Sequence, residues 1–121
     1  GIQFATLTDI ITKAWSGNTT KEYKILKGLK KENLRDNMTN TELILNMLAE
    51  ASTKDISQVE NPETFEESAK IAQQGGKIAG DARKALEAKT GKKVVTSLNA
   101  KTALKEKDEP KQIDKKKPKD K

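Results

Sequence analysis

Two Thr-x-x-Glu segments, each directly before a run rich in apolar residues, constrain this chain more than any other feature. Thr39 precedes Glu42 by three residues, and Thr64 precedes Glu67 by the same interval. At this spacing the two side chains of a pair can each satisfy an exposed amide at the start of a helix. Pro62 supports the second start, because proline fits the first turn of a helix, where its missing N–H is not needed. The sequence therefore predicts helices that begin behind Thr39 and Thr64.

Two further helices are predicted ahead of these by apolar residues at helical spacing. The first covers Leu7–Trp15 with Thr8 as its N-cap, and it ends in the Ser-Gly-Asn that follows Trp15. The second begins after Thr19 or Thr20 and has Gly28 near its end. Trp15 and Tyr23 fall on the apolar stripes, so we expect both in the core.

The helix behind Thr39 has apolar residues on nearly all its sides, especially over Leu43–Leu48. A helix of this kind is typically buried, so we expect it to be the central one. The helix behind Thr64 runs from Phe65 to a stop at Gly91.

Small residues interrupt this last helix. A glycine inside a helix costs about 1 kcal/mol relative to alanine, so Gly75-Gly76 needs an explanation. The pair either kinks the helix or lets another backbone approach closely across Gly75, Gly76, Ala79 and Gly80. We favour the close approach, because small residues continue beyond the pair.

The predicted fold is all-α, a small bundle of four to five helices, because no run alternates apolar and polar residues over the length of a strand. We expect one helical domain over residues 1–104, in which Ser97 caps a last helix through Leu104. The lysine-rich residues 105–121 contain two prolines and one aliphatic residue. Such a segment buries too little surface to offset the entropy of ordering it, so we expect a disordered basic tail.

The composition argues against catalysis. The 121 residues include no Cys and no His, which removes thiolate zinc sites, cysteine nucleophiles and the commonest general base. No recognisable catalytic or phosphate-binding motif occurs, and paired acids such as Glu63 and Glu67 lie where helix starts favour acids. We expect no enzyme activity, no cofactor and no metal site. No apolar run approaches the roughly 20 residues of a membrane span, so we expect no membrane contact.

Positive charge is the feature that suggests a binding function. The net charge is +6, and basic residues recur at steps of three and four along one stretch. Such a row would line one helical face and could follow a phosphate backbone, although solvated surface helices often have the same pattern. The candidate nucleic-acid contacts are Lys21, Lys24, Lys27, Lys30, Lys31 and Arg35. A second basic cluster, Arg83 to Lys93, lies where cations also complement a helix dipole.

Several strings resemble the C-terminal region of prophage antirepressor-like proteins of the BRO family. They are LTDIITKAW (residues 7–15), TKEYK (20–24), KGLKKENLRDNMT (27–39), TEL (41–43), GG (75–76), AGDAR (79–83) and TGKKVV (90–95). The Met-x-x-Thr-Glu-Leu segment that begins at Met38 is also similar to the DNA-damage-inducible protein D group. The resemblance covers roughly residues 5–104.

This resemblance implies a cytoplasmic protein of a prophage or mobile element that acts in DNA-linked transcription regulation. Family members typically carry a separate N-terminal BRO domain that is credited with DNA binding. The chain lacks such a domain, and its start at Gly1 is consistent with removal of that domain from a longer protein. The resemblance implies no catalytic residue.

Two hypotheses follow. In the first, the module contacts DNA, or a DNA-binding partner such as a phage repressor, through the basic face from Lys21 to Arg35. In the second, it is a protein-interaction or homodimerisation domain without direct DNA binding. Its interaction surface is then the small-residue face formed by Gly75, Gly76, Ala79 and Gly80, which permits close helix packing. The helix over Leu43–Leu48, apolar on nearly all its sides, supports the same hypothesis.

Overall fold

The computed structural model describes residues 2–98, and within this range it confirms the all-α prediction. The elements are α1 (Ile2–Ser16), α2 (Thr20–Leu26), the short 3-10 helix η1 (Arg35–Asn37), α3 (Asn40–Glu60) and α4 (Phe65–Thr90). No strand occurs in this part of the chain. The predicted helix through Leu104 and the predicted tail, residues 105–121, lie outside the described residues.

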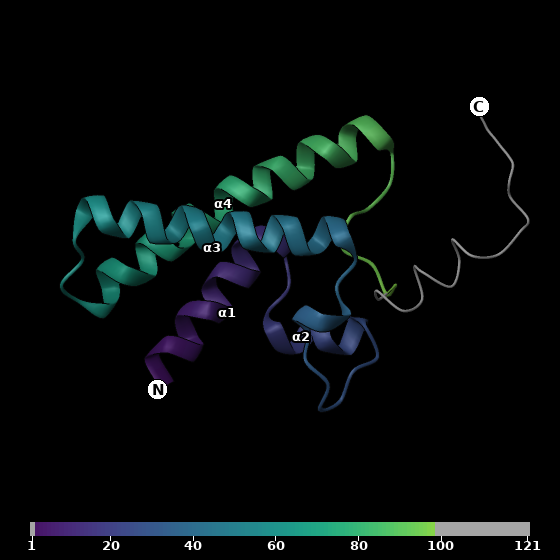
Figure 1. The fold of residues 1–121 in the computed structure, drawn as a ribbon, viewed down its shortest axis with the longest axis horizontal. Coiled ribbons are helices and arrows are strands. Elements are labelled where there is room, and N and C mark those ends of the chain that lie inside the picture. The colour runs from purple at the N-terminus through teal and green to yellow at the C-terminus, as the bar shows by residue number, and fades with distance from the viewer. Residues whose placement is uncertain (1, 99–121) are drawn as a thin grey trace, which may run out of the picture.

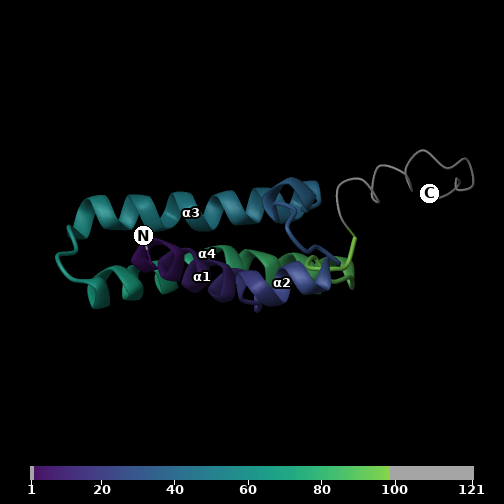
Figure 2. The ribbon, with the colours of Figure 1, turned by 90° about the horizontal axis from the view of Figure 1, so that it is seen from below.

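The helices form two layers. Figure 2 shows α3 on one side of the molecule and α1, α2 and α4 on the other. A short connection, residues 61–64, joins α3 to α4 at one end, whereas α2 and the end of α4 lie toward the opposite end (Figure 1). In the part of the chain that the structure describes, no helix combines the length and the apolar character that crossing a bilayer requires.

The predicted helix starts are confirmed at their caps. Thr39 Oγ1 accepts the Glu42 N–H, and the Glu42 carboxylate accepts the Thr39 N–H at 2.8 Å, a complete capping box. At the start of α4, Thr64 Oγ1 accepts the Glu67 N–H at 3.1 Å. The Glu67 carboxylate, however, accepts the N–H of Glu63 at 2.7 Å, one residue earlier than a capping box requires.

The predicted start of the first helix is wrong. Helix α1 begins at Ile2, so Thr8 lies inside it and its carbonyl accepts a hydrogen bond from Thr12 Oγ1 at 2.9 Å. The physical reason is that residues 3–7 include neither glycine nor proline, so nothing stops the helix from extending toward the N-terminus.

The glycine pair in α4 allows close helix contact, as we favoured, and α4 continues unbroken through it. A Cβ at Gly75 would lie 2.6 Å from the Thr53 backbone nitrogen in α3. A Cβ at Gly76 would lie 2.4 Å from Ala14 Cβ in α1, and one at Gly80 would lie 2.8 Å from the Ala14 carbonyl oxygen. Helix α4 therefore contacts α1 and α3 at backbone distance.

The prediction that the helix behind Thr39 is the most buried is wrong. Leu45 and Ala49 of α3 are buried, but the exposed fractions of Ile44, Met47 and Leu48 are 56%, 50% and 38%. Helix α3 forms an outer layer, so only one side of it has neighbours to pack against (Figure 2). The small residues of α4 place that helix in the centre instead.

The aromatic core joins three helices. Trp15 of α1 and Tyr23 of α2 are completely buried, as expected, with ring centroids 6.0 Å apart. Trp15 Nε1 donates to Asn46 Oδ1 of α3 at 3.1 Å. Buried Leu34 and Met38 complete this cluster and hold the segment between α2 and α3 in place.

Candidate functional site

An open groove between α1 and α2 brings together three of the predicted basic residues. Its volume is about 780 Å³. The residues that line it come from α1, from α2 and from the segment after α2; they are Ala5, Thr8, Asp9, Thr20, Lys21, Lys24, Ile25, Leu29 and Lys30. We call this feature the lysine groove.

Local hydrogen bonds fix α2 at the edge of the lysine groove. Thr19 and Glu22 form a capping box at the start of α2. The Thr20 N–H donates to Asp9 Oδ1 of α1 at 2.9 Å, so Asp9, which also lines the groove, is engaged in holding α2 against α1. Gly28, at φ 74°, ends the helix where we predicted.

The two sides of α2 differ sharply. Lys21, Lys24 and Ile25 lie on the outward side, and the exposed fraction of Ile25 is 67%. Tyr23 and Lys27 lie on the inward side and are buried. Lysines at three-residue steps do not stay on one face, because each step falls about 60° short of a full turn. Lys27 is consequently rotated away from Lys21 and onto the face of Tyr23.

The structure therefore contradicts the prediction that Lys27 is a nucleic-acid contact. Its ammonium group lies 2.5 Å from Glu42 Oε1, and both side chains are fully excluded from solvent. It also donates to the carbonyl oxygen of Leu98. Lys27 would have to leave both Glu42 and the Leu98 carbonyl oxygen to reach a phosphate.

Tyr23 completes this buried cluster. Its hydroxyl donates to Glu42 Oε2, and burial, together with this hydrogen bond to a carboxylate, raises the pKa of Tyr23 above its ordinary value. Glu42 thus accepts from the Thr39 N–H, the Tyr23 hydroxyl and the Lys27 ammonium group. The capping box predicted Glu42 at the start of a helix, but no signal that we used predicted its burial; the four-residue spacing of Tyr23 and Lys27 is the signal that was available.

Arg35 does not belong to a continuous basic face either. It lies on η1 rather than on α2, which ends at Leu26. Its Nη1 donates to both carboxylate oxygens of Glu50 at 3.0 Å, while 47% of its side chain stays exposed. The predicted single face from Lys21 to Arg35 is therefore wrong, because α2 is too short to carry it and two of its six members are held by carboxylates.

Four of the six predicted basic contacts remain available. Lys21, Lys30 and Lys31 are exposed and Lys24 is half-buried. Within residues 2–98, none of these four ammonium groups forms an ion pair with a carboxylate. Lys31 follows Lys30 in the chain but does not line the lysine groove.

The predicted small-residue interaction surface is occupied within the chain. Gly75, Gly76, Ala79 and Gly80 are all buried, and the glycines contact α1 and α3 of the same molecule. A second copy could reach them only if α1 or α3 moved away. This face is therefore a packing surface of the bundle. The homodimer hypothesis keeps only its other support, the apolar surface of α3, where Ile44, Met47 and Leu48 are exposed.

The second basic cluster is also partly engaged. Arg83 Nη1 donates to both carboxylate oxygens of Glu87 at 3.0 Å, and Arg83 Nε donates to the carbonyl oxygen of Trp15 at 2.7 Å. The N–H of Val94 donates to Glu87 Oε2 at 3.0 Å. Hydrogen bonds from Val94 and Arg83 lower the pKa of Glu87. Arg83 thus ties α4 to the end of α1 rather than to a ligand.

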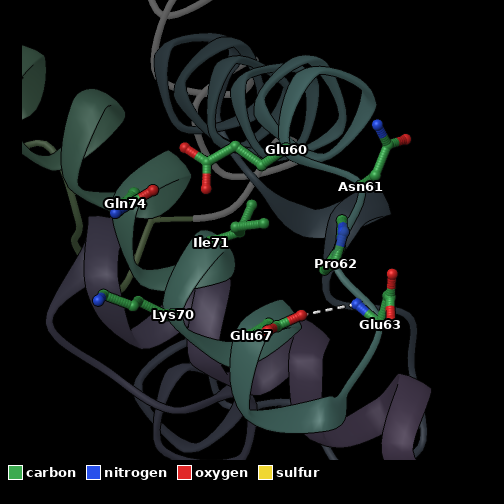
Figure 3. A pocket seen from close by; sticks show the side chains of 8 residues that line it. All are labelled: Glu60, Asn61, Pro62, Glu63, Glu67, Lys70, Ile71 and Gln74. Atoms are coloured by element: carbon green, nitrogen blue, oxygen red, sulfur yellow. Dashed lines mark hydrogen bonds between the residues drawn. The ribbon is translucent and has the colours of Figure 1, made fainter.

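A polar pocket at the connection between α3 and α4 gathers acidic side chains (Figure 3). Its volume is about 670 Å³, and it is lined by Glu60, Asn61, Pro62, Glu63, Glu67, Lys70, Ile71 and Gln74. Asn61 ends α3 in the left-handed conformation, and Glu67 is used in the helix start described above. Among the described residues, no group of three or more acids is placed to hold a metal ion.

The comparisons with known proteins add no relative: no protein-family model, no curated protein and no solved structure matches this chain.

Proposed function

We propose that this chain is a helical interaction module of a cytoplasmic, DNA-linked regulatory protein of the prophage antirepressor type. In this proposal the lysine groove contacts an anionic surface of a DNA-binding partner. The resemblance of residues 5–104 to the BRO family and to the DNA-damage-inducible protein D group supports the regulatory role. The geometry of the groove supports the site.

The single observation that carries the proposal is that Lys21, Lys24 and Lys30 line one groove and form no ion pair with a carboxylate of residues 2–98. Lys27, Arg35 and Arg83 are held by acids, and the other unpaired lysines of residues 2–98 do not line this groove. Cations gathered around a concave surface attract anions and steer their approach. This surface is therefore the best candidate for contact with an anionic partner.

A protein partner fits this groove better than duplex DNA does. A row that follows a phosphate backbone needs several basic side chains in register, and two of the six predicted members are engaged inside the fold. Ile25 and Leu29 add aliphatic surface to the same groove. Aliphatic surface is typical of contacts with proteins and contributes little to contacts with phosphates.

Direct contact with duplex DNA is the second candidate. Exposed Lys31 and the net charge of +6 favour it. Nonspecific electrostatic binding of this kind is strongly weakened by salt.

Binding to two anionic probes, poly-L-glutamate and a short duplex DNA, tests the site. The full chain is compared with a Lys21→Glu/Lys24→Glu/Lys30→Glu variant by fluorescence anisotropy at low and at physiological salt. A matched control, Lys54→Glu/Lys70→Glu/Lys84→Glu, changes the same net charge at lysines that do not line the groove. We expect the groove variant to lose binding and the control to keep most of it. Equal losses in both variants would show that only net charge matters and would refute the site.

A further inference from the structure

We infer that the partner segment for the lysine groove is an acidic amphipathic helix, whose carboxylates meet the lysines while its apolar side chains cover Ile25 and Leu29. This inference rests on the proposed function and specifies the chemistry of the partner. It begins from the aliphatic side chains that line the groove rather than from its lysines.

Ile25 has no role in the core of this fold. It lies on the outward side of α2, directly after Lys24 and four residues after Lys21, with 67% of the residue exposed. It does not belong to the core cluster or to the apolar residues packed against that cluster. Leu29, the other aliphatic residue from this side of the groove, packs against the core and also lines the groove.

Lysines and aliphatic side chains line the same groove, and this combination defines the partner. Lys21 and Lys24 are on α2, and Lys30 follows Leu29 in the segment after it. A partner with carboxylates beside an apolar stripe would meet lysines and aliphatic side chains at once. A helix supplies that pattern, because residues three and four apart share a face.

The dimensions of the groove favour a short helical segment. From Ala5 to Asp9 the α1 wall rises by about one turn, and the volume of about 780 Å³ is open to solvent on one side. A partner helix would therefore contact the groove through one or two turns. Contacts of this size give weak and reversible binding, which suits a regulatory encounter.

The test separates the contribution of the aliphatic side chains to binding from that of the lysines. The probe is a labelled helical peptide of about 15 residues with leucines on one face and glutamates beside them. A second peptide keeps the glutamates and replaces the leucines with serine. Ile25→Asn removes the exposed aliphatic side chain from the groove and leaves all lysines in place. The control, Val59→Asn, changes a residue that is 80% exposed on α3 and does not line the groove.

We expect the full chain to prefer the leucine peptide to the serine peptide by about tenfold, the effect of covering one aliphatic side chain. Ile25→Asn should abolish this preference, and Val59→Asn should preserve it. Circular dichroism is the control for folding, and we expect both variants to keep their helices because both positions are exposed.

Each contrary outcome has a distinct meaning. If the serine peptide binds equally well, or if Ile25→Asn leaves the preference unchanged, the amphipathic partner is refuted while an anionic site at the lysines still stands. If duplex DNA binds more tightly than either peptide and is insensitive to Ile25→Asn, the partner is DNA and the inference is overturned. If reversal of Lys21, Lys24 and Lys30 affects no probe, the proposed function itself fails.

Discussion

The ammonium group of Lys27 lies 2.5 Å from Oε1 of Glu42, and neither side chain touches solvent. Removing one member of a buried ion pair leaves the other charge without compensation, which typically costs 3–5 kcal/mol, whereas replacing both is far less harmful. This pair therefore determines how the fold responds to mutation around α2.

We predict that Lys27→Met lowers the free energy of unfolding by about 3–5 kcal/mol, whereas Lys21→Met on the exposed side of the same helix changes it little. The measurement is urea unfolding followed by the fluorescence of Trp15, the only tryptophan in the chain. Adding Glu42→Gln to Lys27→Met should restore part of the loss. A double variant less stable than the two single losses combined would contradict this assignment.

A second prediction concerns alkaline pH. In the folded chain the pKa of Tyr23 is raised above its ordinary value of 10.0, mainly by burial and then by the Glu42 carboxylate. The folded state therefore keeps a proton that the unfolded state releases, so this stabilisation is present below about pH 10 and is lost as the pH rises further. The expected slope from this group is about 1.4 kcal/mol per pH unit.

Comparison with Tyr23→Phe isolates this contribution from the lysines, which titrate in the same range. The stability of the tyrosine chain should fall more steeply above pH 10 than that of the phenylalanine variant. Parallel curves would show that Tyr23 does not resist deprotonation in the folded chain.

The third prediction concerns helix packing. Gly76→Ala should destabilise the chain by about 1–3 kcal/mol, because the new methyl group would lie 2.4 Å from Ala14 Cβ and 2.8 Å from the Ile11 carbonyl oxygen. Gln74→Ala, at an exposed position of the same helix, provides the control. Thermal unfolding by circular dichroism measures both, and an unchanged or raised melting temperature for Gly76→Ala would argue against backbone contact between α1 and α4.

A fourth prediction concerns acidic pH. Hydrogen bonds from the Val94 N–H and from Arg83 hold the pKa of Glu87 below its ordinary value of 4.5. The resulting stabilisation is present above that value and is lost as the pH falls through the lower pKa of the folded state. Glu87→Gln should therefore be less stable than the natural chain at pH 7, with a difference that shrinks toward pH 3.

Asp55→Asn is the matched control, because Asp55 is exposed on α3. Unfolding in urea at several pH values measures both variants. A deficit for Glu87→Gln that stays constant down to pH 3 would show that the carboxylate charge does not stabilise the segment around Val94.

Local signals in the sequence predicted much of the fold. The starts of α3 and α4 follow from Thr39 and Thr64, whose hydroxyl groups bond amides only a few residues away. Gly28 and Gly91 ended helices where we expected, because both adopt positive φ. Such features depend on neighbours in the chain and can be predicted without knowing the tertiary structure.

The failures concern distant contacts. The sequence pattern predicted a core position for Ile44, Met47 and Leu48, yet the layers of this bundle leave these residues at the surface. We predicted Lys27 at the surface, but it is buried against Glu42, which lies fifteen residues away in the sequence. Three of the predicted lysines do meet at one groove, although the segment that follows α2, rather than one long helix, brings Lys30 there.

One carboxylate links parts of the chain that lie far apart in the sequence. Glu42 accepts hydrogen bonds from the Thr39 N–H at the start of its own helix, from the Tyr23 hydroxyl and from the Lys27 ammonium group. The same ammonium group donates to the carbonyl oxygen of Leu98. Opening any of these segments breaks hydrogen bonds to the shared carboxylate. Amide hydrogens of α2 and of the first turns of α3 should therefore exchange with deuterium together, as one cooperative unit, instead of fraying separately.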